Sequence, residues 1–495
     1  MAARTGQQYV ERLAARRPTV HIHGETVTEA IHLHPAFRNL VESYASLYDM
    51  QHDPELRDVM TYDSPTSGER VGMSFIVPRS IEDLERRRAM MKTWADRSLG
   101  TLGRTGDYLN CAVMALSQAT TWFAQADPAF AANVQAYYER VREEDLLLTH
   151  TLISPQANRS QDAAQQQGGA LTARIVSEDD SGVVIRGARM LATIGPIADE
   201  LLVFPSTVLK GTPEDAPYSF AFAISCDAPG LRFICRESLD YGRSHFDHPL
   251  GSRFEEIDAV VVFDDVHVPY ERCFLLGHPE MCNAFYIDTT AVAHMTHQVA
   301  TRALAKTEAT LGLASLLASA IGIEPFQHVQ EDLAEIIVTL EIIHGLIRAA
   351  EADAQVSEFG VMTPRMESLN ACRNWFPKAS QRFPQILRKF GASGMMALPT
   401  LADVNGEAHD DIERYLQSAS LAGSDRVQLF RLAWDASMSA FAGRQTLYEY
   451  FFFGDPVRMA AALVRGYDRT AAIEHVRSFL AQSAAGGVPA AATDG

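Results

Sequence analysis

The chain has 495 residues, of which 47% are hydrophobic and 21% are charged, values that are ordinary for a soluble globular protein. A chain of this length can bury a large core and is expected to form two or three domains or layers. Its 62 acidic and 43 basic residues give a formal charge of −19. This balance argues against nucleic acid and against an anionic membrane as partners, because both bind basic surfaces.

The cysteines and the apolar segments indicate the compartment. The six cysteines are widely spaced and include no C-x-x-C pair, so we expect free thiols in a reducing environment. Residues 1–17 carry charges throughout and lack the apolar centre of a signal peptide. The longest apolar run, Leu311 to Ile323, is too short to cross a bilayer. We therefore expect a cytoplasmic protein without a membrane partner.

Residues 1–145 are expected to form an N-terminal, mainly helical domain. Ser80 is followed by acidic residues at Glu82 and Asp83 and then by a long helical pattern. A serine in this position predicts a helix N-cap, and the acidic residues suit the first turn.

Residues 146–273 are expected to form a middle β domain. The segments 171–176 and 183–185 flank a turn at 178–182 and predict a hairpin rich in β-branched residues. Further short strands are predicted at 201–204, 220–224, 231–234 and 260–263. Short strands with regular turn signals favour a small barrel or a sandwich.

Residues 274–482 are expected to form a C-terminal helical bundle. Between Asp332 and Ala354 six aliphatic residues recur at helical spacing and predict one core-facing stripe; they are Leu333, Ile336, Ile337, Leu340, Ile343 and Ile347. Ser424 is predicted to cap the helix that follows it. Residues 483–495, rich in Ala and Gly, are expected to be a disordered tail.

Three side chains stand out for their chemistry, namely Arg104, Tyr108 and His150. An arginine can place a fixed positive charge beside a phenolate oxygen. A tyrosine can donate a hydrogen bond to that oxygen, and a histidine with an ordinary pKa can pass a proton near neutral pH. The three residues could therefore bind a phenol, although residues of these types are more often surface or packing residues.

Nucleotide-binding and metal-binding motifs are missing from the sequence. No G-x-G-x-x-G motif follows a strand and opens a helix, and no P-loop is present. His294 and His297 have the spacing of two metal ligands on one helix face, but no nearby Glu or Cys completes a set. We expect a packed or interface pair there and no metal.

Six sequence blocks, in this order, resemble the large, flavin-dependent oxygenase component of the 4-hydroxyphenylacetate 3-hydroxylase family. The resemblance runs from about Arg4 to Leu480. The blocks are GRTGDYLN at 103–110, THTLISPQANRS at 149–160, GARMLATIGPIADELLVFPST at 187–207, the segment 251–269, HMTHQVA at 294–300 and FFFGDPVRM at 451–459.

The resemblance implies a multidomain α+β chain with the acyl-CoA dehydrogenase-like fold, in which a middle β-barrel domain lies between a helical domain and a helical bundle. It also implies a two-component monooxygenase that hydroxylates a phenol ortho to its hydroxyl and yields a catechol. FADH2, bound non-covalently, would come from a separate NAD(P)H:flavin reductase. Molecular oxygen would be the co-substrate and a flavin C4a-hydroperoxide the oxygen donor. The family also leads us to expect a homotetramer.

The family's flavin contacts correspond to residues in three segments of this chain. Together with His150 they are Gln156, Ala157, Asn158, Arg159, Thr193, Asp455, Pro456, Val457 and Arg458. Two of them, Arg159 and Arg458, could balance pyrophosphate charge.

The family's substrate contacts correspond to Arg104, Tyr108 and His150 around the phenol oxygen, with Ser206 and Thr207 at the far end of the substrate. The first three are also the implied catalytic residues. The chain departs from the family at Gly106, where proline is usual; a glycine there frees the backbone and leaves the shape of the pocket open.

Several alternatives remain open at this stage. The substrate could be 4-hydroxyphenylacetate, another small phenolic acid, a halophenol, or a tyrosine-like unit tethered to a carrier protein. A flavin-dependent dehydrogenase or dehydratase of the same fold, acting on an acyl thioester, would need a catalytic Glu or cluster cysteines that we cannot place. A non-catalytic, oligomer-forming relative is the third possibility.

Overall fold

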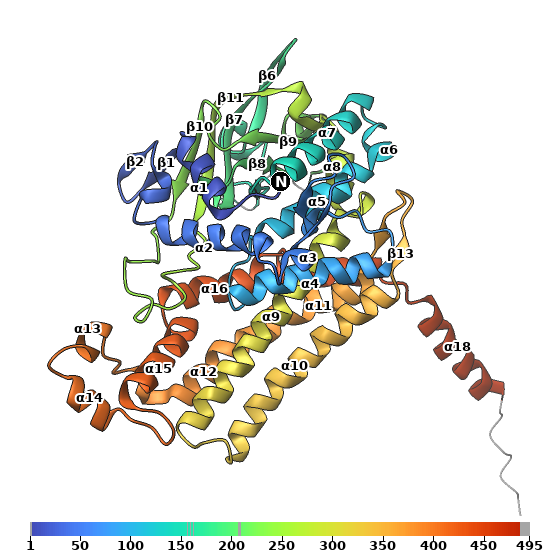
Figure 1. Ribbon diagram of the computed structural model, residues 1–495. Helices are drawn as coiled ribbons and strands as arrows, with labels where there is room; N and C mark the ends of the chain where they lie inside the picture. Colours follow the sequence, from blue (N-terminus) through green and yellow to red (C-terminus); the bar gives the residue numbers. More distant parts are fainter. Residues whose placement is uncertain (1, 156, 159, 162, 206–208, 486–495) are drawn as a thin grey trace, which may run out of the picture.

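The computed structural model describes residues 2–485 except for 156, 159, 162 and 206–208. Two β-sheets and the helices around them form one half of the molecule, and a bundle of long helices forms the other (Figure 1). The first half holds one large hydrophobic core, and the bundle holds a second one. The expected order of helices, strands and helical bundle is therefore confirmed.

The helices of the first 144 residues pack beside the sheets and on the end of the bundle that faces the sheets (Figure 1). The main ones are α1 (Gly6–Ala15), α2 (Arg38–Asp49), α4 (Ile81–Arg97), α5 (Gly106–Gln118) and α7 (Pro128–Glu144), with short turns at α3 (Arg57–Met60) and α6 (Thr120–Phe123). The side chain of Ser80 accepts a hydrogen bond from the N–H of Asp83, which confirms the predicted N-cap of α4.

The described strands form a six-stranded sheet, a four-stranded sheet and two pairs, β3 (Thr61–Asp63) with β4 (Arg70–Gly72) and β13 (Gln355–Val356) with β14 (Met362–Thr363). The first has the order β2 (Glu25–Val27), β1 (Thr19–Ile22), β10 (Leu231–Cys235), β11 (Asp258–Pro269), β7 (Gly182–Thr193) and β6 (Arg174–Asp179). The second has the order β12 (Cys273–Leu276), β9 (Phe220–Ser225), β8 (Glu200–Val203) and β5 (Leu148–Thr151).

The expectation of a closed barrel is wrong for the described strands, because the six-stranded and the four-stranded sheet are separate and open. The predicted hairpin is present as β6 and β7, and the carboxylate of Asp179 accepts hydrogen bonds from the N–H groups of Ser181 and Gly182 in its turn. Strand β1, from the N-terminal segment, pairs in parallel with β10. The six-stranded sheet thus crosses the expected limit at residue 145, and the limits at 145 and 273 stay predictions.

The bundle is built around two long antiparallel helices, α9 and α10 (Figure 1). Its helices are α9 (Ala291–Ala320), α10 (Gln327–Ala352), α11 (Met366–Ala379), α12 (Phe383–Gly391), α13 (Leu401–Val404), α14 (His409–Tyr415), α15 (Gly423–Ser437), α16 (Ala440–Phe451) and α17 (Pro456–Gly466). Helix α8 (Pro279–Asp288), just before α9, packs into the core of the sheet half, and α18 (Thr470–Ala485) follows the bundle. Helices α4 and α5 pack on α9 and connect the two halves.

Two details of the bundle differ from the sequence-based expectations. On α10, Ile337 is 45% exposed, whereas Ile336, Ile343 and Ile347 are buried, so the core-facing stripe is narrower than predicted. Ser424 lies inside α15 and does not cap it; the carboxylate of Glu413 accepts hydrogen bonds from the N–H groups at the helix start instead. Residues 483–485 continue α18, and the rest of the expected tail, 486–495, lies outside the described residues.

Candidate functional site

The three candidate phenol-binding residues come from two elements and the loop between α4 and α5. Arg104 lies in this loop, Tyr108 in the first turn of α5, and His150 on β5. The carboxylate of Glu256 accepts hydrogen bonds from the N–H groups of Gly103 and Arg104, at 2.8 and 2.6 Å. The loop is therefore held in place by a buried acid from a distant part of the chain.

The structure brings these side chains together in the interior. Arg104, Tyr108 and His150 are 8%, 4% and 7% exposed. The Cζ atom of Arg104 lies 4.4 Å from the centroid of the Tyr108 ring, and the rings of Tyr108 and His150 are 5.7 Å apart. A cation, a phenolic hydroxyl and an imidazole thus share one buried cluster, in which a desolvated ligand oxygen would interact strongly with the charge of Arg104.

Their protonation states follow from burial and from the arginine. Burial alone would lower the pKa of Arg104, but Tyr448, Tyr108 and Glu256 raise it above its ordinary value. Burial raises the pKa of Tyr108. Burial, and then the charge of Arg104, hold the pKa of His150 well below its ordinary value. The expectation that His150 titrates near neutral pH is therefore wrong: it is a neutral imidazole beside a fixed cation.

The low pKa of His150 predicts a pH dependence of stability. An unfolded chain protonates this histidine below about pH 6.5 whereas the folded chain does not, so its burial costs stability that grows as the pH falls. When the pH is lowered from 6.5 to 5.5, we expect the free energy of unfolding of His150→Asn to fall by about 1 kcal/mol less than that of the unmodified chain. Chemical denaturation at the two pH values measures this, and equal losses would contradict the neutral state.

Aromatic side chains that sequence reasoning missed surround the cluster. Phe204 lies next to the end of β8. The centroid of its ring is 6.0 Å from that of His150 and 5.9 Å from that of Tyr286 on α8. On the other side, Arg104 donates a hydrogen bond of 2.8 Å to the hydroxyl of Tyr448 on α16. No local motif could have identified these residues, because apolar and aromatic side chains of this kind occur throughout the core.

A network of ion pairs surrounds Tyr448 on the side away from the phenol cluster. Arg302 on α9 binds Glu449 through two hydrogen bonds of 2.7 Å, and Arg444 pairs with Asp258 at 2.9 Å and with Glu256 at 3.2 Å. Because Arg302 and Arg444 each have an acid partner, the network can hold Tyr448 and the Arg104 loop without leaving either guanidinium unpaired.

The implied flavin residues after β5 are only partly described. Gln156 and Arg159 lie outside the described residues. Ala157 and Asn158 are exposed, and the side-chain oxygen of Asn158 accepts hydrogen bonds from the N–H and hydroxyl of Ser160. The side chain of Asn158 is therefore engaged in a local turn.

The other implied flavin residues lie on β7 and at the start of α17. Thr193, at the end of β7, donates a hydrogen bond of 2.8 Å to Asp258. The carboxylate of Asp455 caps α17 by accepting hydrogen bonds from the N–H groups of Val457 and Arg458. The side chains of Asp455, Val457 and Arg458 are exposed, and Pro456 is half-buried. No hydrogen bond or ion pair between described residues links this helix start to Thr193 or to the Arg104 cluster.

The residues expected at the far end of the substrate, Ser206 and Thr207, lie outside the described residues. The last described aromatic residue before them, Phe204, lies beside His150, with 6.0 Å between the ring centroids.

Unsatisfied donors around the cluster fit a flavin. In the part of the chain that the structure describes, Nε of Arg104, Nε of Arg373, Nε and Nη2 of Arg189 and the hydroxyl of Tyr286 are buried without a partner. Leaving such groups unpaired is costly. A flavin offers ring carbonyls, ring nitrogens and phosphates that accept hydrogen bonds from donors of this kind.

His294 and His297 are a buried, packed pair, as expected. Arg87 contacts Nδ1 of both, at 3.0 and 3.4 Å, and Nε2 of His297 lies 3.0 Å from the carboxylate of Glu351. Within residues 2–485, gaps excepted, no group of three or more His, Cys, Asp or Glu side chains is arranged to hold a metal ion. All six cysteines are free thiols.

Gly106, where the family usually has proline, lies at the start of α5 in a backbone conformation that proline could also adopt. This residue is the first of α5, a position where proline is favoured, and Thr105 before it has the extended backbone that precedes proline, with φ −59° and ψ 153°. A Cβ atom at Gly106 would make ordinary contacts, 3.4 Å or more from its neighbours. The glycine therefore sits in a regular helical turn.

We expect Gly106→Pro to stabilise the fold by about 0.4–1 kcal/mol, because it restricts the unfolded chain without straining the helix start. Chemical denaturation measures the change, with Gly106→Ala as the control that adds a Cβ atom without the ring. A destabilised proline variant would show that the start of α5 needs the freedom of glycine.

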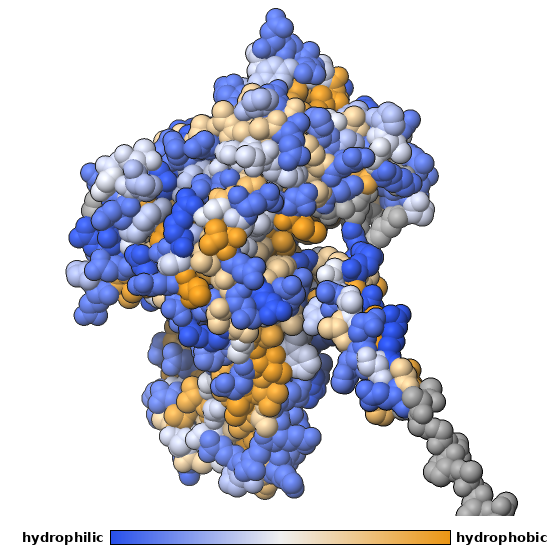
Figure 2. All heavy atoms as spheres, turned by 90° about the vertical axis from the view of Figure 1, so that its right-hand side faces the viewer, coloured by the Kyte–Doolittle hydropathy of each residue, from blue (hydrophilic) through white to orange (hydrophobic). Residues whose placement is uncertain are grey.

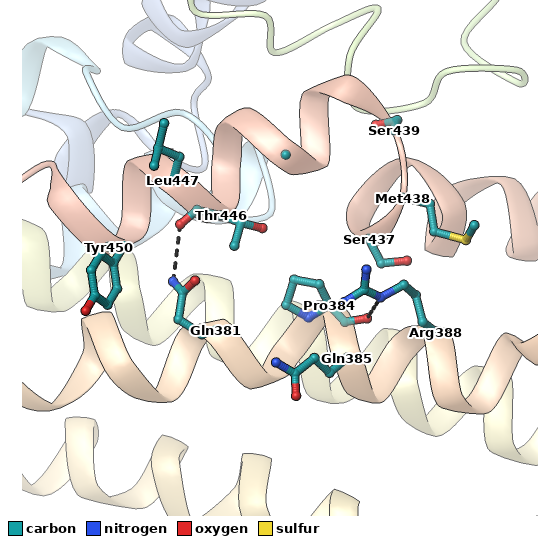
Figure 3. A pocket seen from close by; sticks show the side chains of 11 residues that line it. Gln381, Pro384, Gln385, Arg388, Ser437, Met438, Ser439, Thr446, Leu447 and Tyr450 are labelled. Carbon is teal, nitrogen blue, oxygen red and sulfur yellow. Dashed lines mark hydrogen bonds between the residues drawn. The ribbon is translucent and has the colours of Figure 1, made fainter.

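A separate open groove lies between α12 and α16 (Figure 3). The amide of Gln381 donates a hydrogen bond to the carbonyl of Thr446 across it. Met438, just after the end of α15, and Leu447, on α16, also line the groove. None of the predicted site residues lines this groove.

No helix in the described part of the chain combines the length and the apolar character that a membrane span needs.

Comparison with known proteins places the chain. Residues 5–275 match the model of the family described as 4-hydroxyphenylacetate 3-hydroxylase N terminal, and residues 282–481 match the corresponding C-terminal model. The 4-hydroxyphenylacetate 3-monooxygenase oxygenase component of Geobacillus sp. is 50% identical over 97% of both chains. That of Thermus thermophilus is 46% identical over 97% of this chain and 98% of its own.

Solved structures agree with this result. A crystal structure of the oxygenase component of 4-hydroxyphenylacetate 3-monooxygenase, complexed with FAD and 4-hydroxyphenylacetate, aligns with a TM-score of 0.93 at 46% identity, over 97% of this chain and 99% of the other. A 4-hydroxybutyryl-CoA dehydratase from N. maritimus has the same fold, with a TM-score of 0.84 at 20% identity over 97% and 95% of the two chains. The chain belongs to the 4-hydroxyphenylacetate 3-hydroxylase family.

Proposed function

We propose that this chain is the oxygenase component of a two-component, FADH2-dependent monooxygenase that hydroxylates a phenol ortho to its hydroxyl. The substrate class is 4-hydroxyphenylacetate and similar phenolic acids, and the product is a catechol. The observation that carries the proposal is the buried cluster of Arg104, Tyr108 and His150. The membership of the chain in the family and its relatives of 46–50% identity support it.

The three residues have distinct roles in this proposal. Arg104, a cation held by Glu256 and Tyr448, would stabilise negative charge as it develops on the phenol oxygen. Tyr108, kept protonated by burial, would donate a hydrogen bond to that oxygen. His150, kept neutral, would accept the phenol proton. The oxygen-bearing ring would then be electron-rich at the carbon beside the hydroxyl.

FADH2 is proposed to bind beside this cluster, after delivery by a separate NAD(P)H:flavin reductase. Bound reduced flavin supplies activated oxygen. Thr193, the segment 156–159 and the start of α17 at 455–458 are the proposed flavin contacts. The aromatic residues around His150 would keep water from the reacting groups.

A panel of phenols tests this proposal. The chain is incubated with FAD, NADH, a generic flavin reductase and each phenol, and the products are identified by mass. We expect a product one oxygen atom heavier from 4-hydroxyphenylacetate or a close analogue. Turnover of a carrier-tethered tyrosine-like unit alone would place the substrate in the tethered class. Peroxide from every substrate, with no binding of reduced FAD, would contradict the proposal.

We also propose that the chain forms a homotetramer. Helix α17 has no buried residue, and residues 470–482 of α18 are exposed in a single chain. Helix α18 stands away from the body of the molecule (Figures 1 and 2). On α18, Ile473, Val476 and Leu480 are 45%, 56% and 61% exposed and have the spacing of one helix face. Such a face is stable in water when another subunit covers it.

We expect removal of residues 470–495 to lower the mass of the assembly, because it removes this apolar face. Removal of residues 486–495 alone is the matched control and should leave the mass unchanged. Light scattering after size-exclusion chromatography measures both. An unchanged tetramer after the longer truncation would exclude α18 from the interface.

A further inference from the structure

Two acids near the start of β11 each hold one part of the proposed site. The carboxylate of Glu256 is fully buried and accepts hydrogen bonds from the N–H groups of Gly103 and Arg104. Two residues later in the sequence, the carboxylate of Asp258 accepts a hydrogen bond of 2.8 Å from the hydroxyl of Thr193. Arg104 is the proposed phenol contact and Thr193 is a proposed flavin contact. The acids that support the two contacts are therefore close neighbours in the chain.

A single arginine, Arg444 on α16, joins these two acids. Its Nε and Nη2 atoms donate to the two oxygens of Asp258, at 3.0 and 2.9 Å, and its Nη1 atom donates to Glu256 at 3.2 Å. The Cζ atom of Arg444 also lies 4.6 Å from the centroid of the Tyr448 ring, whose hydroxyl accepts a hydrogen bond from Arg104. A guanidinium is planar and presents its N–H groups in fixed directions, so it fixes the two carboxylates relative to each other in a way that a lysine cannot.

Arg444 differs in its contacts from the second arginine at Asp258. Arg236 pairs with Asp258 at 3.0 Å and with Glu255, but it donates only to the main-chain carbonyl of Glu256. Among the described residues, Arg444 is the one cation that forms an ion pair with the Glu256 carboxylate. Although burial alone would raise the pKa of Asp258, Arg444 and then Arg236 hold it well below its ordinary value. The two arginines thus share Asp258, and of the two only Arg444 reaches the carboxylate of Glu256.

The geometry points to a role that rests on the proposed function: Arg444 is a positioning residue that couples the binding of flavin at Thr193 to the binding of phenol at Arg104. Every contact in the series from the Thr193 hydroxyl to the main chain of Arg104 is a hydrogen bond between buried or half-buried groups. A ligand that restrains Thr193 also restrains this series of side chains, so the phenol meets a loop that is already ordered. The coupling is reciprocal, because bound phenol favours flavin binding by the same factor.

A purely structural role for Arg444 is the alternative, and the two roles can be separated by experiment. If Arg444 only stabilises the fold, its removal weakens phenol binding by the same factor whether or not flavin is bound. If Arg444 couples the two sites, its removal abolishes the increase in phenol affinity that flavin causes. The ratio of the phenol dissociation constants without and with flavin therefore distinguishes the two roles.

The test uses the full chain with Arg444→Met, which keeps a long side chain and removes the charge and the N–H donors. Arg236→Met is the matched control, because it removes the other arginine from Asp258 and leaves the ion pair with Glu256 in place. Binding of 4-hydroxyphenylacetate is measured by anaerobic equilibrium dialysis for each protein, without flavin and with saturating reduced FAD, so that no turnover occurs. If Arg444→Met does not fold, Glu256→Gln breaks the same link and is judged in the same way. Its amide oxygen still accepts from the two N–H groups of the loop, but its amide nitrogen cannot accept from Arg444.

We expect reduced FAD to raise the phenol affinity of the unmodified chain by at least about fivefold, and we expect this increase to disappear in Arg444→Met. Arg236→Met should keep the increase. Equal phenol affinities with and without flavin in the unmodified chain would overturn the inference, as would an increase that survives in Arg444→Met or is lost in both arginine variants. Complete loss of phenol binding in Arg444→Met and in Glu256→Gln would make the network a support of the loop alone and would also overturn it. An unmodified chain that binds neither reduced FAD nor 4-hydroxyphenylacetate would contradict the proposed function itself, and the inference with it.

Discussion

His150→Ala is expected to lower the rate of phenol hydroxylation by about 10²–10⁴-fold, the range that a positioned acid–base group contributes. The reason is local: His150 is the neutral imidazole beside Tyr108, and no other described histidine contacts this cluster. Flavin oxidation should continue, so hydrogen peroxide should rise as the catechol falls. Parallel assays of catechol and peroxide measure the ratio directly.

The control for this variant is His328→Ala, which removes an exposed histidine from α10. It should leave both the rate and the coupling unchanged. If His150→Ala keeps the coupling of the unmodified chain, His150 takes no part in the reaction and the role proposed for it is wrong.

Arg104→Ala is expected to weaken binding of the phenol by about 10- to 100-fold, the equivalent of one charged hydrogen bond. Reduced FAD should bind nearly as well as before, because the proposed partner of Arg104 is the phenol oxygen. Titration of each ligand, followed by fluorescence or calorimetry, separates the two affinities.

Two further variants make this second prediction specific. Tyr448→Phe removes the hydroxyl that accepts from Arg104 and keeps the ring, so it should cause a smaller loss through poorer positioning. Arg186→Ala removes an exposed arginine paired with Asp265 on the outer part of the sheet and should have no effect. An equal loss of flavin affinity in Arg104→Ala would move Arg104 from the phenol site to the cofactor site.

The sequence predicted those parts of the fold that depend on neighbouring residues. The β6–β7 hairpin follows from β-branched residues around a polar turn, and the cap of α4 follows from Ser80 and its acidic first turn. The cap of α15 could not be predicted in this way, because its start is held by Glu413 rather than by Ser424. The pairing of β1 with β10 could not be predicted either, because no residue near β1 in the sequence specifies which distant strand it pairs with.

The site shows the same division. Arg104, Tyr108 and His150 could be named from their blocks in the sequence, but their protonation could not, because the low pKa of His150 depends on burial beside Arg104. Tyr448 and Glu256 come from elements that reach the site only through the tertiary fold. That the exposed start of α17 contacts the flavin remains a prediction. In the proposed tetramer, a second subunit could cover this helix start and complete the flavin site.

The most direct measurement is a crystal structure of this chain grown without oxygen in the presence of reduced FAD and 4-hydroxyphenylacetate. The account predicts the phenol oxygen within about 2.6–3.2 Å of donor or acceptor atoms of Arg104, Tyr108 and His150, with the flavin ring against the same cluster. A phenol bound elsewhere, or a flavin ring separated from these three side chains by protein, would contradict it.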